Sequence, residues 1–243
     1  MIKTVLISIF MVTCFSLGYS AEKKEYLCGI AIGYPPYQYV GENGESAGID
    51  YEVTKAVFAA SGLKVKFIQG AWDDVLFALI HKTGKVDLLC GAEMNQERKQ
   101  WLDFSDSYYS RNIVIFTLRD SKIQSVKDLY GKIVTGDRHS YIEREMGVDK
   151  NKIRIMQTAS KEESFQKLKS GEVVAVVAPL EVGNYIAKNL KIDVRIIEEK
   201  DPGSPVAFAV AKGDLELQMK INESLKKLIK DGTIDKILKK YSK

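Results

Sequence analysis

Short apolar runs alternate with segments of helical periodicity in the first half of this chain. The runs YLCGIAIG (26–33), KVKFI (64–68) and VDLLC (86–90) predict buried strands. Between them, apolar residues recur at helical spacing from Ile49 to Gly62 and again over 73–82, and Asp50 is placed to cap or charge the first helix. Strands separated by helices pair in parallel, so the sequence predicts an α/β fold.

The same alternation continues to the end of the chain, without an internal repeat. Further strands are predicted at 112–118, 132–136, 152–156, 173–179, 193–197 and 205–211, with helices between them and two closing helices. Ligands of open α/β sheets bind at the carboxyl ends of strands. We therefore look for a site at residues 33–34, 91–93, 136–140 and 178–179.

The charge distribution argues against a nucleic-acid partner. The chain has 243 residues and a net charge of +4, and its lysines and acids are interspersed. This pattern indicates a solvated surface rather than a basic stripe. No nucleophile–base pair, phosphate-binding glycine loop or metal cluster is recognisable, so we expect no catalytic residue, cofactor or metal.

The N-terminus predicts export. Lys3 precedes an apolar run from Val5 to Leu17, and small residues allow cleavage before Ala21, as in a secretory signal peptide spanning residues 1–20. An uncleaved anchor is the alternative, and a lipoprotein at Cys14 is a weaker one. No later segment is apolar enough to span a bilayer.

Two cysteines, Cys28 and Cys90, remain after cleavage. An even pair in an exported protein suggests a disulfide, whereas two buried free thiols are the alternative. Spacing alone does not decide between them.

Five motifs in order resemble the family-3 periplasmic solute-binding proteins, the polar amino-acid receptors of ABC importers. They are YPPY (34–37) with GID (48–50), AWDDVLFALIHKTGKVD (71–87), GAEMNQERKQWLDFSDSYY (91–109), SVKDLYGKIVTG (125–136) and LKKLIKDGTIDKILKKYSK (225–243). The resemblance implies two α/β lobes joined by two crossing strands, near 111–114 and 205–207. Lobe 1 would comprise 22–112 and 207–243, and lobe 2 would comprise 113–206. Cys28 and Cys90 would then lie on neighbouring strands, which permits a disulfide.

The resemblance also implies a ligand site. Arg98 matches the family arginine that holds the ligand's α-carboxylate through its planar fork; from the residues alone, a surface arginine paired with Glu97 or Asp103 is the alternative. Tyr34 would line the cleft and stack on the ligand, and Tyr37 would pack within its lobe. Trp72 falls at the cleft edge or in the core.

The second-lobe turn that supplies amides and a hydroxyl to the carboxylate aligns with His139 and Ser140. Three positions depart from the family pattern. Acids expected to contact the ligand's amino group align with Ala31 and Pro179, and a small or hydroxyl position aligns with Glu93.

A buried charge needs a partner, so we hypothesise that Glu93 faces the cleft. It would bind an amine or guanidinium of the ligand, or pair with Arg98 or Arg138 in the empty site. The alternative is a glutamate that points to solvent. Glu181 is a second candidate acid.

The sequence thus predicts a monomeric periplasmic receptor that captures a carboxylate-bearing solute and delivers it to an ABC permease. One alternative is a periplasmic cyclohexadienyl (arogenate or prephenate) dehydratase, whose motif shares the asparagine found here at Asn95, with Glu93 or Glu181 as the acid. Another is a receptor for a separate membrane sensor. The identity of the ligand does not follow from the sequence.

Overall fold

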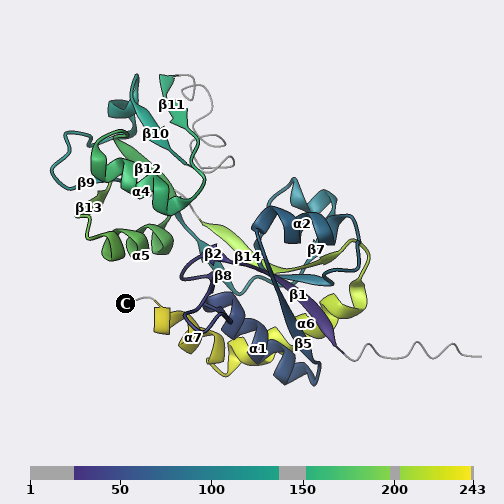
Figure 1. The fold of residues 1–243 in the computed structure, drawn as a ribbon. Helices are drawn as coiled ribbons and strands as arrows, with labels where there is room; N and C mark the ends of the chain where they lie inside the picture. The colour runs from purple at the N-terminus through teal and green to yellow at the C-terminus, as the bar shows by residue number, and fades with distance from the viewer. Residues whose placement is uncertain (1–24, 137–151, 198–202, 242–243) are drawn as a thin grey trace, which may run out of the picture.

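The chain forms two α/β lobes, each built on its own sheet, in a computed structural model that describes residues 25–136, 152–197 and 203–241 (Figure 1). The predicted fold class is confirmed. The predicted signal peptide, Arg138, His139, Ser140 and the helix expected to begin at 140 lie outside the described residues.

The first sheet has six strands and contains both early and late parts of the chain. Its order is β5-β1-β6-β14-β7, and β8 also pairs with β14. β1 is parallel to β5 and β6, whereas β14 runs antiparallel to β6. The strands are β1 (Tyr26–Ala31), β5 (Val65–Gly70), β6 (Leu88–Glu93), β7 (Leu102–Phe104), β8 (Tyr109–Arg111) and β14 (Ser204–Ala211).

Four helices belong to this lobe: α1 (Ile49–Ser61), α2 (Trp72–Ile80), α6 (Leu215–Lys230) and α7 (Thr233–Tyr241). Gly62 ends α1 in the left-handed conformation, as expected, with φ of 71°. Asp50 lies in the first turn of α1, as expected of an acid that charges the helix start, but it does not cap the helix. Gly48 is the N-cap, and the carboxylate of Asp50 is fully buried and bonded to other elements. A small sheet of β2 (Gly33–Tyr34), β3 (Gln38–Val40) and β4 (Ser46–Ala47) lies beside it.

The second sheet has five strands in the order β11-β10-β12-β9-β13. β10 pairs in parallel with β11 and β12, while β9 is antiparallel to β12 and β13. The strands are β9 (Ile113–Leu118), β10 (Ile133–Thr135), β11 (Arg154–Met156), β12 (Ala175–Pro179) and β13 (Val194–Ile196). The helices are α4 (Lys161–Ser170), α5 (Leu180–Leu190) and the short η2 (Val126–Leu129).

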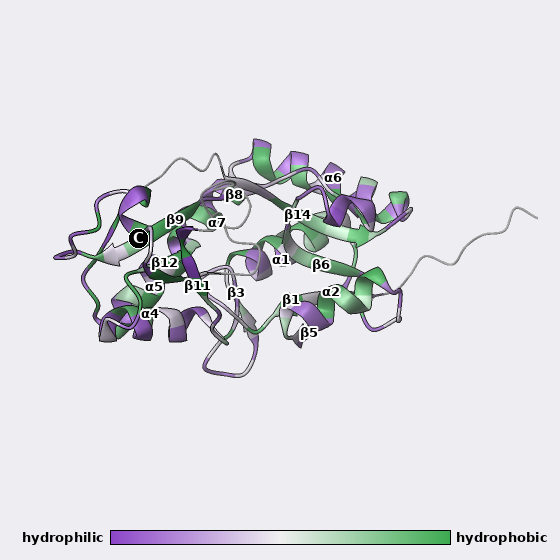
Figure 2. Cartoon of the chain, turned by 90° about the horizontal axis from the view of Figure 1, so that it is seen from above, coloured by the Kyte–Doolittle hydropathy of each residue, from purple (hydrophilic) through white to green (hydrophobic). Residues whose placement is uncertain are grey.

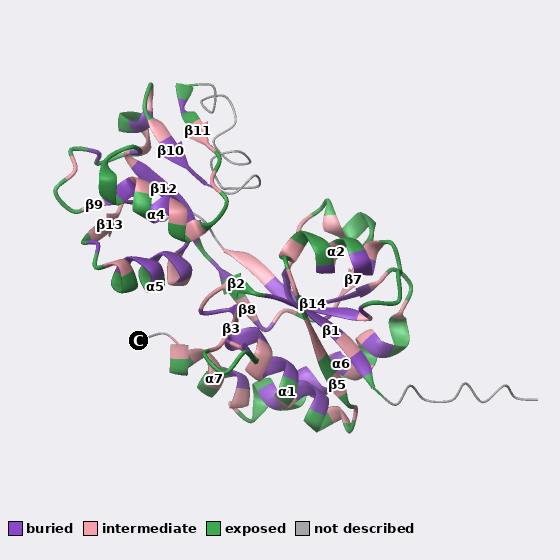
Figure 3. Ribbon diagram, viewed as in Figure 1, coloured by how far each residue is buried: buried purple, intermediate pink, exposed green. Residues whose placement is uncertain are grey.

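The chain crosses between the sheets at Asn112, because β8 ends in the first sheet at Arg111 and β9 begins in the second at Ile113. It re-enters the first sheet at β14. The strands β1, β6, β9, β12 and β14 are largely apolar and buried, and polar, exposed residues gather on the helices around the sheets (Figures 2 and 3). Buried charged residues such as Asp50 and Arg111 are therefore exceptions to the apolar interior of the first lobe.

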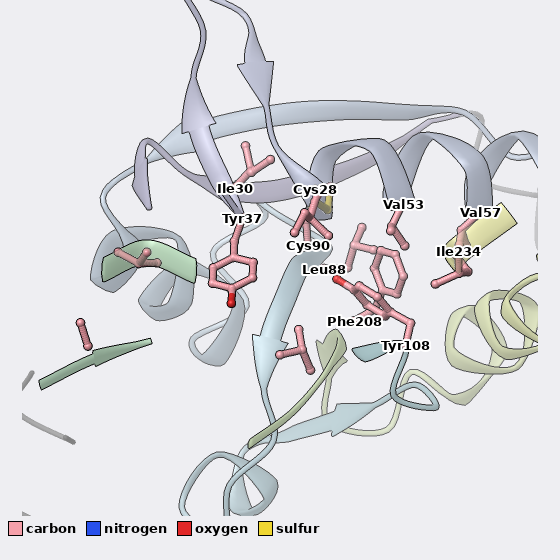
Figure 4. Close-up of a cluster of buried hydrophobic side chains, with 14 of the residues drawn as sticks. Cys28, Ile30, Tyr37, Val53, Val57, Leu88, Cys90, Tyr108, Phe208 and Ile234 are labelled. Atoms are coloured by element: carbon pink, nitrogen blue, oxygen red, sulfur yellow. A yellow bond between two sulfur atoms is a disulfide. The ribbon is translucent and has the colours of Figure 1, made fainter. Parts of the chain in front are cut away.

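The core of the first lobe joins helices and strands that are distant in sequence. Val53 and Val57 of α1 pack with Leu88 of β6, Phe208 of β14 and Ile234 of α7 (Figure 4). All five are nearly or fully buried. This packing fixes the carboxyl end of β6, where several predicted site residues lie.

The predicted disulfide is confirmed: Cys28 of β1 is bonded to Cys90 of β6 (Figure 4). The two Cα atoms are 6.0 Å apart, and both side chains are fully buried. The bond links adjacent parallel strands and encloses α1, β5 and α2 within a separation of 62 residues. It closes a long loop, which restricts the unfolded chain.

Replacing both cysteines with alanine is expected to lower the free energy of unfolding by about 2–4 kcal/mol, because the unfolded chain regains the entropy of that loop. Urea denaturation of both proteins measures the difference. A thiol assay on the denatured wild type serves as the control and should find no free thiol at these positions. Unchanged stability together with two titratable thiols would contradict the bond.

Among the residues that the structure describes, no helix is both long and apolar enough to cross a membrane. Within the same residues, no group of three or more histidine, cysteine or acidic side chains is arranged to hold a metal ion.

Candidate ligand-binding site

The predicted first-lobe residues gather near the carboxyl ends of β1 and β6. Tyr34 ends β2, Trp72 begins α2, Glu93 ends β6 and Arg98 begins the short helix η1 (Arg98–Gln100). All four side chains are partly buried. The structure therefore brings together residues that are up to 64 positions apart (98 − 34).

Arg98 is held by its own segment and remains available to a carboxylate. Its Nη1 donates to the backbone oxygen of Glu93 at 2.9 Å, and its guanidinium carbon lies 5.1 Å from the Trp72 ring centroid. Burial lowers the pKa of Arg98, and the nearby carboxylate of Glu93 opposes this shift. Among the described residues, no carboxylate forms an ion pair with Arg98, and Asp103 pairs with Lys212 at 2.7 Å instead.

Asn95 orients this arginine through the backbone. Its side-chain oxygen accepts a hydrogen bond of 2.8 Å from the backbone N–H of Arg98. This side-chain-to-backbone hydrogen bond ties Asn95 to the first residue of η1 and restrains the backbone from which the Arg98 side chain projects. Asn95 thus positions Arg98. This structural role accounts for the asparagine without the dehydratase alternative, which rests on the same residue.

Glu93 faces a different partner from those expected. Its Oε1 lies 3.6 Å from Nη1 of Arg111, and its side chain is 20% exposed. From the sequence we expect Arg98 or Arg138. Among the described residues, the guanidinium of Arg98 donates to the backbone oxygen of Glu93 rather than to its carboxylate, and Arg138 lies outside those residues. The Glu93 carboxylate is thus partly accessible to solvent, and the charge of Arg111 partly neutralises its own.

Arg111 is a site residue that sequence reasoning missed. It is 4% exposed, and its Nη2 bonds to Oδ2 of Asp50 at 2.7 Å. Nε donates to the Tyr109 hydroxyl at 2.9 Å, and Nη2 lies 3.3 Å from the backbone oxygen of Gly91. The available signal was a single arginine directly before the apolar run NIVIF.

Asp50 is an acceptor for four donors. Besides Arg111, its carboxylate accepts hydrogen bonds from Gln38 at 2.7 Å, Tyr108 at 2.8 Å and Tyr109 at 3.0 Å. Burial raises the pKa of Asp50, while Arg111 and these hydrogen bonds oppose that rise. Four converging donors match the ionised, acceptor-only carboxylate, so we assign an ion pair here.

Gly91 makes the approach of Asp50 possible. Its φ is 68°, and a Cβ built there would lie 2.1 Å from the Asp50 carboxylate. Only glycine accommodates both this backbone conformation and this distance.

Three tyrosines surround the Arg111 guanidinium. Its central carbon lies 4.3 Å from the ring centroid of Tyr37, 5.2 Å from that of Tyr34 and 5.4 Å from that of Tyr109. Tyr37 and Tyr109 stack at 5.5 Å, and Tyr37 is nearly buried. Burial raises the pKa of Tyr34 and of Tyr37, so both phenols remain neutral. We call Tyr34, Tyr37 and Tyr109 the tyrosine cage.

Two second-lobe residues act electrostatically on the first-lobe site. Burial of Lys161, the first residue of α4, lowers its pKa to about 8, and the charge of Glu93 opposes the shift. Burial raises the pKa of Glu181 in the first turn of α5, and Glu181 in turn raises that of Tyr37. Charged residues of the second lobe therefore act electrostatically on Glu93 and on Tyr37 of the tyrosine cage.

The two positions that lack a family acid carry buried apolar residues. Ala31 ends β1 and its backbone N–H donates to Gln38 at 2.8 Å, while Pro179 ends β12 and is buried. Glu93 and Glu181 are the acids that the described residues place near the cleft instead.

Comparisons with known proteins show the family. The family model for bacterial extracellular solute-binding proteins, family 3, matches residues 26–243, and the chain belongs to this family. The arginine-binding extracellular protein ArtP of Bacillus subtilis (strain 168) is 31% identical over 232 residues, covering 92% of this chain and 88% of that protein.

Two solved structures of similar fold bear on the function. An ancestral arginine-binding protein bound to glutamine is 34% identical with a TM-score of 0.79, covering 90% of this chain and 98% of the other. The ancestral amino acid-binding protein AncCDT-1, a precursor of cyclohexadienyl dehydratase, is 32% identical with a TM-score of 0.78, covering 90% of this chain and 96% of the other. The relatives named here are binding proteins.

Proposed function

We propose that this protein captures an amino acid between its two lobes and delivers it to an ABC permease. The observation that carries the proposal is Arg98, a partly buried guanidinium at the start of η1 that lacks a carboxylate partner among the described residues. A guanidinium in this setting pairs with a ligand carboxylate through two charge-assisted hydrogen bonds.

Glu93 is proposed to hold the ligand's α-ammonium. Its carboxylate is 20% exposed and has one ion-pair partner among the described residues, Arg111 at 3.6 Å, so acceptor positions remain for a second cation. This would replace the acids that the family pattern places at Ala31 and Pro179. Tyr34 and Trp72 would flank the bound solute, and Tyr37 would support Tyr34 from within the lobe. The predicted contributions of His139 and Ser140 stay a proposal.

Closure of the lobes would follow from contacts to both of them. The proposed lobe boundaries are 22–112 with 207–243 for lobe 1, and 113–206 for lobe 2. A ligand that touches Arg98 and the second-lobe residues only when the lobes approach stabilises the closed state. The proposal places the mature protein in the periplasm as a monomer, without a catalytic role.

The dehydratase remains a second candidate because Glu181 is an acid whose pKa burial raises, near the tyrosine cage. A general acid requires such a shift. A receptor that signals to a separate membrane sensor would bind its solute in the same way.

A thermal-shift screen of residues 21–243 tests the proposal. The panel holds the amino acids, polyamines, dicarboxylates, opines and prephenate. A ligand that binds only the folded protein stabilises it, by about 2.7 kcal/mol at a hundredfold excess over Kd. This stabilisation raises the melting temperature of the protein. We expect a shift with at least one amino acid. A shift with prephenate that decays as product forms would favour the dehydratase, and no shift with any amino acid would contradict the proposal.

A further inference from the structure

We propose that Arg111 is a specificity-determining residue that directs the cleft toward amino acids with uncharged or acidic side chains and against basic ones. This inference rests on the proposed function and names the substrate class of the same site. It departs from the arginine-binding relatives described above.

The first step concerns the aromatic surface. Faces of tyrosine rings attract cations, and such surfaces suit the guanidinium or ammonium of a basic ligand. Here the guanidinium of Arg111 already lies over the rings of Tyr37 at 4.3 Å and Tyr34 at 5.2 Å. The protein's own cation thus occupies the tyrosine cage, and a second cation at the same faces would meet like charge at close range.

The second step concerns the acids. Asp50 is fully buried and bonded to Arg111 at 2.7 Å, so it is not available to a ligand. Glu93 is shared between Arg111 and, under the proposed function, the α-ammonium of the solute. Neither acid is left for a positive charge on the ligand's side chain.

The third step concerns the remaining charges. Arg98 and Lys161 are cations that act on Glu93 from the first and the second lobe. They favour a solute with one or two carboxylates and oppose a net positive solute. Glu181 in the first turn of α5 is an acid whose charge acts on Tyr37, and burial disfavours its charged form.

Titration calorimetry with two matched ligand pairs tests this inference on the wild-type mature chain. Arginine is compared with citrulline, which replaces the guanidinium by a neutral urea group, and ornithine is compared with glutamine. We expect the neutral member of at least one pair to bind about tenfold tighter or more, which corresponds to 1.4 kcal/mol.

The outcomes separate this inference from the proposed function. Equal or tighter binding of arginine and ornithine would overturn the role of Arg111 but leave an amino-acid receptor. Binding of an acidic amino acid without either basic one would support it. Binding of no amino acid would overturn the proposed function and this inference together.

A double variant then assigns the selectivity to this residue. Asp50→Asn with Arg111→Gln removes both charges and keeps hydrogen-bonding groups in place. We expect its preference for the neutral ligands to fall about tenfold. The control is Arg119→Gln with Asp193→Asn, an exposed pair at 2.6 Å on the second sheet, which should keep the wild-type preference. An unchanged preference in a folded Asp50→Asn/Arg111→Gln protein would overturn the assignment, and the wild-type ratios decide if that protein does not fold.

Discussion

Replacing Arg98 with alanine is expected to weaken amino-acid binding by about 10- to 100-fold, the range of a charged hydrogen bond worth 1.5–3 kcal/mol. The guanidinium contacts the Glu93 backbone and the Trp72 ring, so its removal disturbs only local packing. The fold should therefore remain intact. Calorimetric titration with the amino acid identified by the screen, together with circular dichroism, measures both quantities.

Arg119→Ala is the matched control for this loss. Arg119 is an exposed arginine paired with Asp193 on the second sheet, so its removal changes the net charge equally. It should leave affinity unchanged. If Arg98→Ala binds as tightly as the wild type, or if both variants lose the same affinity, Arg98 does not hold the ligand.

Replacing Asp50 with asparagine is expected to cost about 3–5 kcal/mol of unfolding free energy, because it leaves the buried guanidinium of Arg111 without its closest counter-charge. Arg111 is 4% exposed and Asp50 is fully buried, so water cannot take over the lost interaction. Among the described residues, Glu93, at 3.6 Å, then remains as the one carboxylate paired with Arg111. Urea denaturation monitored by circular dichroism gives the difference.

The Asp50→Asn/Arg111→Gln double variant tests whether the cost comes from an uncompensated charge. Removing both ions is often far less harmful than removing one. We therefore expect the double variant to be more stable than Asp50→Asn alone. A double variant that is less stable by the sum of both single losses would indicate independent packing roles rather than an ion pair.

The regular elements could be predicted because their signals are local. The apolar runs at 26–33, 64–68 and 86–90 each overlap a strand of the first sheet, and helical spacing located α1 and α2. The bonded pair of Cys28 and Cys90 could be expected once the two strands were placed as neighbours. These features depend on periodicity or on the order of elements in the chain.

The buried ion pair could not be predicted, because its members lie 61 residues apart and have misleading local contexts. Asp50 stands at a helix start, where an acid normally interacts with the helix dipole, and the structure instead directs it to Arg111. Arg111 resembles a polar residue at the edge of a strand. Their pairing depends on the crossing of the chain between sheets and on the space that Gly91 leaves.

The candidate site was predicted in part. Arg98, Tyr34, Trp72 and Glu93 do lie near one another, but the partner of the Glu93 carboxylate is Arg111 and not Arg98. Sequence spacing places Arg98 near Glu93 but gives no such indication for Arg111, and only the tertiary structure shows which arginine the carboxylate meets. The direction of each guanidinium is set by tertiary contacts, with Trp72 for Arg98 and the tyrosine cage for Arg111.

A crystal structure of the mature chain with the amino acid identified by the screen tests the central claim most directly. We predict that the ligand's α-carboxylate lies within about 3.2 Å of the Arg98 guanidinium nitrogens, the upper range of such hydrogen bonds, and that its ammonium contacts Glu93. Residues of both lobes should touch the ligand. A carboxylate bound elsewhere, with Arg98 still held only by Trp72 and the Glu93 backbone, would contradict the account.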